Sequence, residues 1–159
     1  MTTPILTAAR QSLWDAIDNF SSLSSAFKSK WRFDTDVAHA FQQIERAGLG
    51  DMPAIAIIPI DVQAQWALHI MMEFTDAYTI DIRAPKLSTC EDLVEKVWKA
   101  IYQAAPVLTP TVTYVRAATG YLPKAVGPIQ RNPIATDSLK CWQFRFNVGL
   151  RLRQDPFTA

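Results

Sequence analysis

The chain has 159 residues, of which 49% are hydrophobic and 19% charged, as in a folded globular domain rather than a disordered chain. This length suits a single domain, 1–159. The longest uncharged central stretch, 62–72, is far short of the ~20 apolar residues of a membrane span, and the N-terminus lacks a signal-peptide pattern. Two cysteines, Cys90 and Cys141, are too few for a disulfide scaffold. We therefore expect buried, reduced thiols in a protein that folds in a cytoplasm and does not contact a membrane.

The formal net charge is +1, but its distribution along the chain is uneven. Residues 1–33 carry four basic and two acidic side chains (+2), residues 34–95 three and eleven (−8), and residues 96–159 nine and two (+7). Folding could interleave these segments and remove the contrast. Alternatively, the surface has an acidic and a basic side, which favours head-to-tail self-association.

The first third of the sequence predicts two helices separated by a strand. Apolar residues recur at helical spacing over 5–20, and serines end that helix. The period then changes to two over 26–33, which predicts a strand with Lys28, Lys30 and Arg32 on one face. A second, short helix is expected over 37–47.

The middle of the sequence predicts a buried strand over 54–60 and a hairpin with arms at 66–75 and 78–83, joined by a turn at Asp76-Ala77. A capping-box pattern at residue 88 opens a third helix that ends near Pro106. The pattern predicts an α+β fold with a mostly antiparallel sheet and helices packed on one face, in the order α-β-α-β-β-β-α-β-β.

The last third is expected to contain a short strand at 111–116, a long irregular loop at 117–139 and a closing strand over 140–153. The strand alternates apolar and polar residues, so its apolar set should pack against the helix that carries Trp98 and Ile101. Apolar side chains in the loop suggest that it orders against a neighbouring molecule. The loop, the outer face of the closing strand and the basic strand face supply the predicted interface residues: Lys28, Lys30, Arg32, Tyr121, Leu122, Ile129, Arg145, Arg151 and Arg153.

No pattern in the sequence predicts a catalytic, cofactor-binding or metal site. His39 and His69 lack a second ligand at metal-binding spacing, and Cys90, although it lies at a helix N-terminus, has no identifiable base. The Gly48-Leu49-Gly50 sequence lacks the third glycine of a dinucleotide loop. Basic residues could follow phosphates, but the neighbouring aromatics alternate toward the core. We expect no enzyme activity, no cofactor and no sequence-specific nucleic-acid binding.

The chain resembles the tail terminator and tail-completion proteins of long-tailed bacteriophages. The resemblance rests on the order of elements, the entry Asp51-Met52-Pro53-Ala54-Ile55 into a core strand, and the hairpin 68–83 followed by the helix 88–105. The closing stretch, from Pro133 to Asp137 and then from Trp142 to Val148, is also similar to the final strand of that family. The resemblance covers nearly the whole chain, but the helix 37–47 and the loop 117–139 are not matched to it, so it does not decide which virion-neck or tail protein this is.

The resemblance implies a homo-oligomeric ring, typically a hexamer, at the head-proximal end of a tail tube. Its partners would be the tail tube protein and the head-completion or neck protein, and the protein would reside in the tail or neck of a virion assembled in the host cytoplasm. Two alternatives remain open at this point. One is another neck, tube or baseplate subunit, and the other is a non-viral domain that binds a small ligand or nucleic acid.

Overall fold

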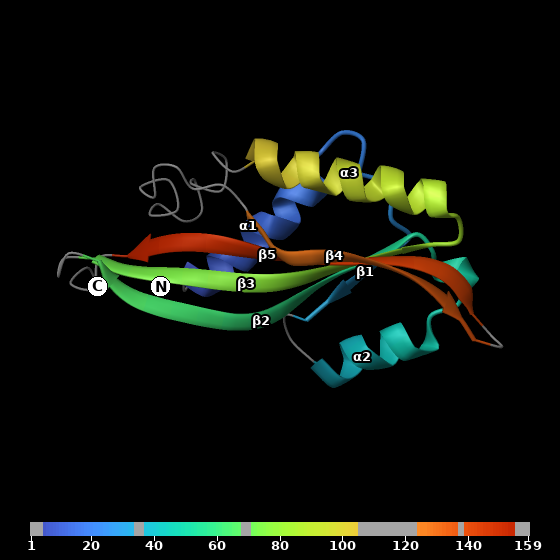
Figure 1. The fold of residues 1–159 in the computed structure, drawn as a ribbon, viewed down its shortest axis with the longest axis horizontal. Helices are drawn as coiled ribbons and strands as arrows, with labels where there is room; N and C mark the ends of the chain where they lie inside the picture. The colour runs from blue at the N-terminus through green and yellow to red at the C-terminus, as the bar shows by residue number, and fades with distance from the viewer. Residues whose placement is uncertain (1–4, 34–36, 68–70, 105–123, 137–138, 155–159) are drawn as a thin grey trace.

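The computed structural model describes residues 5–33, 37–67, 71–104, 124–136 and 139–154. In these ranges the elements are α1 (Ile5–Asp18), β1 (Ser29–Arg32), α2 (Val37–Arg46), the short 3-10 helix η1 (Leu49–Asp51), β2 (Ala54–Ala67), β3 (Met71–Ala84), α3 (Leu87–Ala104), β4 (Lys124–Ala135) and β5 (Lys140–Gln154). The α+β class and the mostly antiparallel sheet are confirmed (Figure 1).

The five strands form one sheet in the order β1-β2-β3-β5-β4. Only the β1–β2 pair is parallel, and every other neighbouring pair is antiparallel. β3 lies at the centre and pairs along nearly its whole length with β2 on one side and β5 on the other. The segment that separates β1 from β2 in sequence contains α2, which agrees with the need of parallel neighbours for a crossover connection.

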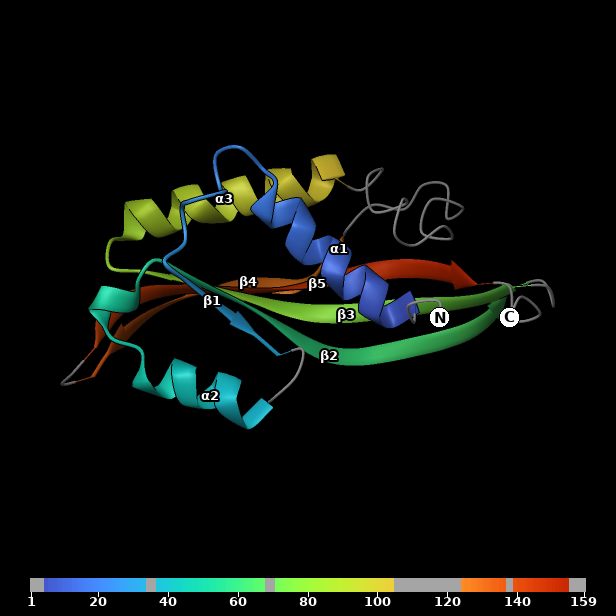
Figure 2. The same ribbon diagram turned by 180° about the vertical axis from the view of Figure 1, so that it is seen from behind.

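The helices cover both faces of the sheet. α1 and α3 lie on one face and α2 lies on the other (Figures 1 and 2). The prediction that the helices pack on one face is therefore wrong for α2. Its cause is visible at the start of β2, where Ile55 and Ile57 point into the core beneath α1 and α3, whereas Ala54 and Ala56 leave room on the opposite face for the indole of Trp31 and for α2.

The main core lies between the sheet and the pair α1 and α3. β5 contributes to it with alternate residues, since Phe144, Phe146, Val148 and Leu150 are all buried there, as the sequence pattern predicts. The ring of Phe146 meets the indole of Trp98 on α3 edge-on, with 5.8 Å between the ring centroids. The closing strand therefore packs against the predicted helix in the predicted register.

The predicted turn at Asp76-Ala77 is wrong, because β3 continues through it from Met71 to Ala84. β2 likewise runs on to Ala67. The three strands expected over 54–83 are therefore two long ones, which pair as a hairpin. The hairpin contains a β-bulge at this point: the register shifts between Pro59 and Val62, so two residues of β2 stand opposite Ala77 of β3.

The predicted irregular loop at 117–139 is wrong for residues 124–135, which form the edge strand β4. Glycine and proline in the sequence favour a break in regular structure, but an edge strand accepts both. The register between β4 and β5 shifts between Val126 and Gln130, so that Gly127 and Pro128 fall within a bulge. The remainder of the expected loop at 117–123 and the strand expected at 111–116 lie outside the described residues.

In the described ranges, no helix is both long enough and apolar enough to span a lipid bilayer. The two cysteines are free and buried, as predicted.

Candidate functional site

Two of the three cations predicted on the first strand share one carboxylate within the chain. Asp18, at the end of α1, accepts hydrogen bonds from Lys30 at 2.5 Å and from Arg32 at 3.1 Å. The guanidinium carbon of Arg32 also lies 4.3 Å from the ring centroid of Trp14, a cation–π contact. Since both cations fasten β1 to α1, they are poorly placed to follow a phosphate backbone. Lys28 is exposed, and its ammonium group donates to the carbonyl oxygen of Gly50 at 3.4 Å.

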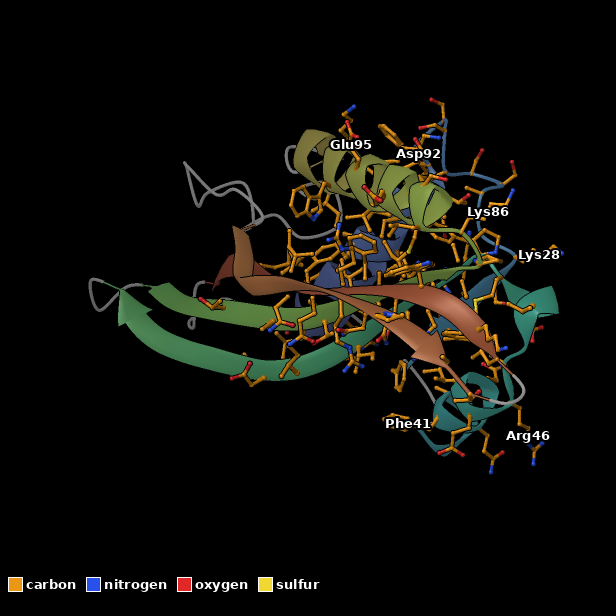
Figure 3. All side chains as sticks on the ribbon, turned by 45° about the vertical axis from the view of Figure 1, so that its right-hand side comes forward. Lys28, Phe41, Arg46, Lys86, Asp92 and Glu95 are labelled. Atoms are coloured by element: carbon orange, nitrogen blue, oxygen red, sulfur yellow. The ribbon has the colours of Figure 1, made fainter. Side chains whose placement is uncertain are left out.

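A polar depression of about 400 Å³ lies between α2 and β1. Its lining is Ser29, Lys30, Trp31, Gln42, Gln43, Arg46 and Asp51. Phe41 and Arg46 are exposed on α2, while Asp92 and Glu95 are exposed on α3 in the opposite layer (Figure 3). The depression combines both signs of charge with amide groups, and its lining does not resemble the mostly apolar lining of a small-molecule pocket.

A buried carboxylate links the two central antiparallel strands on the face that carries α2. Asp81 of β3 is 2% exposed and accepts hydrogen bonds from Arg83 at 3.1 Å and from Gln143 of β5 at 2.6 Å. Arg145, directly opposite Asp81 on β5, places a guanidinium nitrogen 3.5 Å from the same carboxylate. The Arg83 guanidinium in turn lies 5.5 Å from the ring centroid of Trp31. This network ties β3, β5 and β1 together and leaves Arg145 as its exposed member.

The remaining predicted interface residues lie at different places in the chain, and not all of them belong to the described part of the structure. Ile129 lies on β4 and is exposed. Arg151 and Arg153 lie on β5, opposite Thr75 and Glu73 of β3, but their side chains are outside the described part of the structure. Tyr121 and Leu122 lie outside the described residues altogether. The structure therefore does not gather the nine predicted residues into one surface: Lys28, Lys30 and Arg32 lie at the β1 edge, and Ile129 lies on β4 at the other.

The thiols and the buried acids have structural surroundings. The Cys90 thiol contacts the carbonyl oxygen of Ile82 at 3.4 Å, and burial raises its pKa to about 12, the opposite of the activation that a helix N-terminus can give. Burial also raises the pKa of Asp76, which accepts a hydrogen bond from the Tyr78 hydroxyl. Across the described residues, no three histidine, cysteine or acidic side chains are placed to hold a metal ion. His69 and the side chain of His39 lie outside that part.

Two features of the structure were not predicted from the sequence. The first is the Asp81 network, whose partners on β5 can be identified only from the strand register. The second is a pair of exposed apolar side chains on β2, Ile60 at 51% and Val62 at 44%. The neighbouring Pro59 was the available signal for them, because proline within a strand is typical of a sheet edge or a bulge.

Comparison with known proteins finds similarity in fold only. No family model matches the sequence, and no curated protein is similar to it in sequence. A solved structure titled "Virion of native gene transfer agent (GTA) particle" contains a chain with a similar fold. The TM-score is 0.54 at 10% sequence identity, and the match covers 94% of this chain and 99% of that one. The similarity therefore concerns the complete fold of both chains and not a shared fragment.

Proposed function

We propose that the protein is a structural subunit of a phage-like virion. The observation that carries this proposal is the fold similarity to a chain of a gene transfer agent particle, over 94% of one chain and 99% of the other. The resemblance in the order of sequence elements to phage tail proteins supports the same assignment independently of any sequence identity.

Within such a particle, we propose the role of tail terminator: a ring, typically of six copies, at the head-proximal end of the tail tube. The ring would stop tube growth, bind the tail tube protein on one side and bind the head-completion or neck protein on the other. The protein would thus reside in the tail or neck of the virion, after assembly in the host cytoplasm. Exposed apolar side chains at the sheet edges supply surfaces for such contacts.

The proposed role requires no catalysis. The surroundings of the reactive side chains support a role without catalysis. The Cys90 thiol is buried with a raised pKa, and Lys30 and Arg32 both form salt bridges with Asp18. Recognition in a ring depends on the shape and charge of surfaces and needs neither a nucleophile nor a base.

Addition of the purified protein to preformed tail tubes of the same particle tests the role directly. Negative-stain electron microscopy should show one ring at one end of each tube, and tube elongation should stop. Sedimentation velocity on the protein alone should report a closed oligomer whose fraction increases with concentration.

Other outcomes identify the alternatives. Rings that stack into continuous tubes would indicate a tube subunit, and binding to the opposite tube end would indicate a baseplate subunit. A protein that stays monomeric, does not bind tail tubes and binds single-stranded DNA or a small ligand would contradict a virion role.

A further inference from the structure

The sheet has two unlike edges with no strand neighbour among the described residues. β1 pairs only with the first four residues of β2, Ala54 to Ile57, so the outer side of β2 is unpaired from Ile58 to Ala67. At the other end of the strand order, β4 pairs with β5 on one side only. An unpaired strand presents a row of backbone donors and acceptors and is a template for another strand.

Each of these edges carries an exposed isoleucine at a bulge. Ile60 lies within the bulge of β2 and Ile129 within that of β4. Together with Val62, they are three of the six large apolar side chains that are exposed among the described residues, with exposures of 51%, 41% and 44% in that order. Charges, prolines and bulges are the usual protection of an edge against association, and both edges have them, yet large apolar side chains are still exposed there.

The two edges also differ in charge. On β2 the exposed Asp61 stands beside Ile60, and on β4 the exposed Arg131 follows Ile129 by two residues. Pairing of two like edges would bring two aspartates or two arginines into proximity. Pairing of unlike edges brings an aspartate near an arginine and apolar groups near each other, which charge and burial both favour.

Strand direction agrees with the pairing of unlike edges. β2 and β5 run in one direction, whereas β3 and β4 run in the other. If β4 of one copy lies beside β2 of the next and both sheets face the same way, the new pair is antiparallel and the alternation continues. Because the two edges are different surfaces, the contact is heterologous, and repetition of it generates a ring or an open filament.

We infer that the exposed edge of β4 pairs with the exposed edge of β2 in a second copy of this chain. The proline positions limit the paired stretches to residues 60–67 on β2, after Pro59, and 129–132 on β4, between Pro128 and Pro133. This inference rests on the proposed function in one respect, namely that the heterologous contact closes into a ring.

Charge reversal at the two edges tests the contact. The full chain is compared with Asp61→Arg, Arg131→Asp, the double variant and the matched control Lys86→Glu, whose side chain is exposed at the start of α3 (Figure 3). Sedimentation velocity should show that each single reversal raises the concentration for half-assembly at least tenfold, that the double variant restores assembly, and that the control behaves as wild type. Single variants that assemble as wild type, or a double variant that stays impaired, would overturn the inference.

Cysteine cross-linking identifies which edges meet. The native thiols of Cys90 and Cys141 are buried, so Ile60→Cys and Ile129→Cys introduce the exposed thiols. A short bis-maleimide should join a mixture of the two variants into dimers and should leave each variant alone mostly unlinked. Efficient linking of one variant to itself would overturn the inference in favour of like-edge pairing, as would absence of linking in the mixture. Rings that still cap tubes in either case would leave the proposed function standing, whereas failure to bind tubes with intact linking would reject the proposed function alone.

Discussion

Replacement of Phe146 by alanine should remove one of the most deeply buried aromatic side chains of the main core. The ring is 1% exposed and meets Trp98 edge-on at a centroid distance of 5.8 Å. Truncation of a buried phenylalanine costs ~3–5 kcal/mol, which includes the cavity left behind. Since a domain of this kind is stable by only ~5–15 kcal/mol in total, the variant should lose a large part of its stability.

Phe41→Ala is the matched control, because it deletes the same group from a side chain that is 48% exposed. Because Phe41 is largely exposed, the cost should be mainly the lost edge-on contact with Phe33, roughly 0.5–1.5 kcal/mol. Urea unfolding followed by far-ultraviolet circular dichroism, at a protein concentration that favours the monomer, gives both free energies of unfolding. A double-mutant cycle of Trp98→Ala and Phe146→Ala should measure a coupling energy of ~0.5–1.5 kcal/mol between the two side chains.

Equal and small losses in Phe146→Ala and Phe41→Ala would refute this reasoning. They would mean that β5 is shifted by one residue, since such a shift turns the whole apolar set to the other face of the sheet. The buried positions of β5 and their contact with α3 would then both be wrong.

Three other predictions concern the buried polar groups. Asp81→Ala should cost ~3–5 kcal/mol in urea unfolding, because it leaves the 12% exposed Arg83 without its carboxylate. Arg145→Ala truncates a 45% exposed side chain and should cost less than ~1 kcal/mol. A cost below ~1 kcal/mol for both variants would mean that the network adds little to stability. Burial raises the pKa of Asp76 above its ordinary value of 3.8, so the folded protein holds that proton more tightly than the unfolded chain does. Wild type should therefore gain thermal stability relative to Asp76→Asn as pH falls from about 7 toward about 4, and a difference in Tm that does not change with pH would contradict this. Burial raises the pKa of the Cys90 thiol to about 12, so this thiol should not react with an aromatic disulfide reagent at about pH 8 before the protein unfolds; rapid reaction of the native protein would show that the site opens.

The helices and the closing strand can be located from the amino-acid sequence, because they depend on local periodicity. The alternation from Trp142 to Leu150 is long and unbroken, and it fixes which face of β5 is buried wherever the strand lies. The third helix also follows from the local pattern of its own residues, although α3 begins at Leu87, one residue before the predicted capping serine. The buried state of both cysteines also followed from their positions in predicted elements and from their low number.

Tertiary structure alone decided where strands end, which face α2 covers and which charges meet. Glycine, proline and Asp76-Ala77 read locally as breaks, but bulges against a neighbouring strand keep β3 and β4 continuous. The pairing of Lys30 and Arg32 with Asp18 crosses more than ten residues of sequence. The two exposed sheet edges exist only once the strand order is known, because an edge is a property of which neighbours a strand has and not of its own residues.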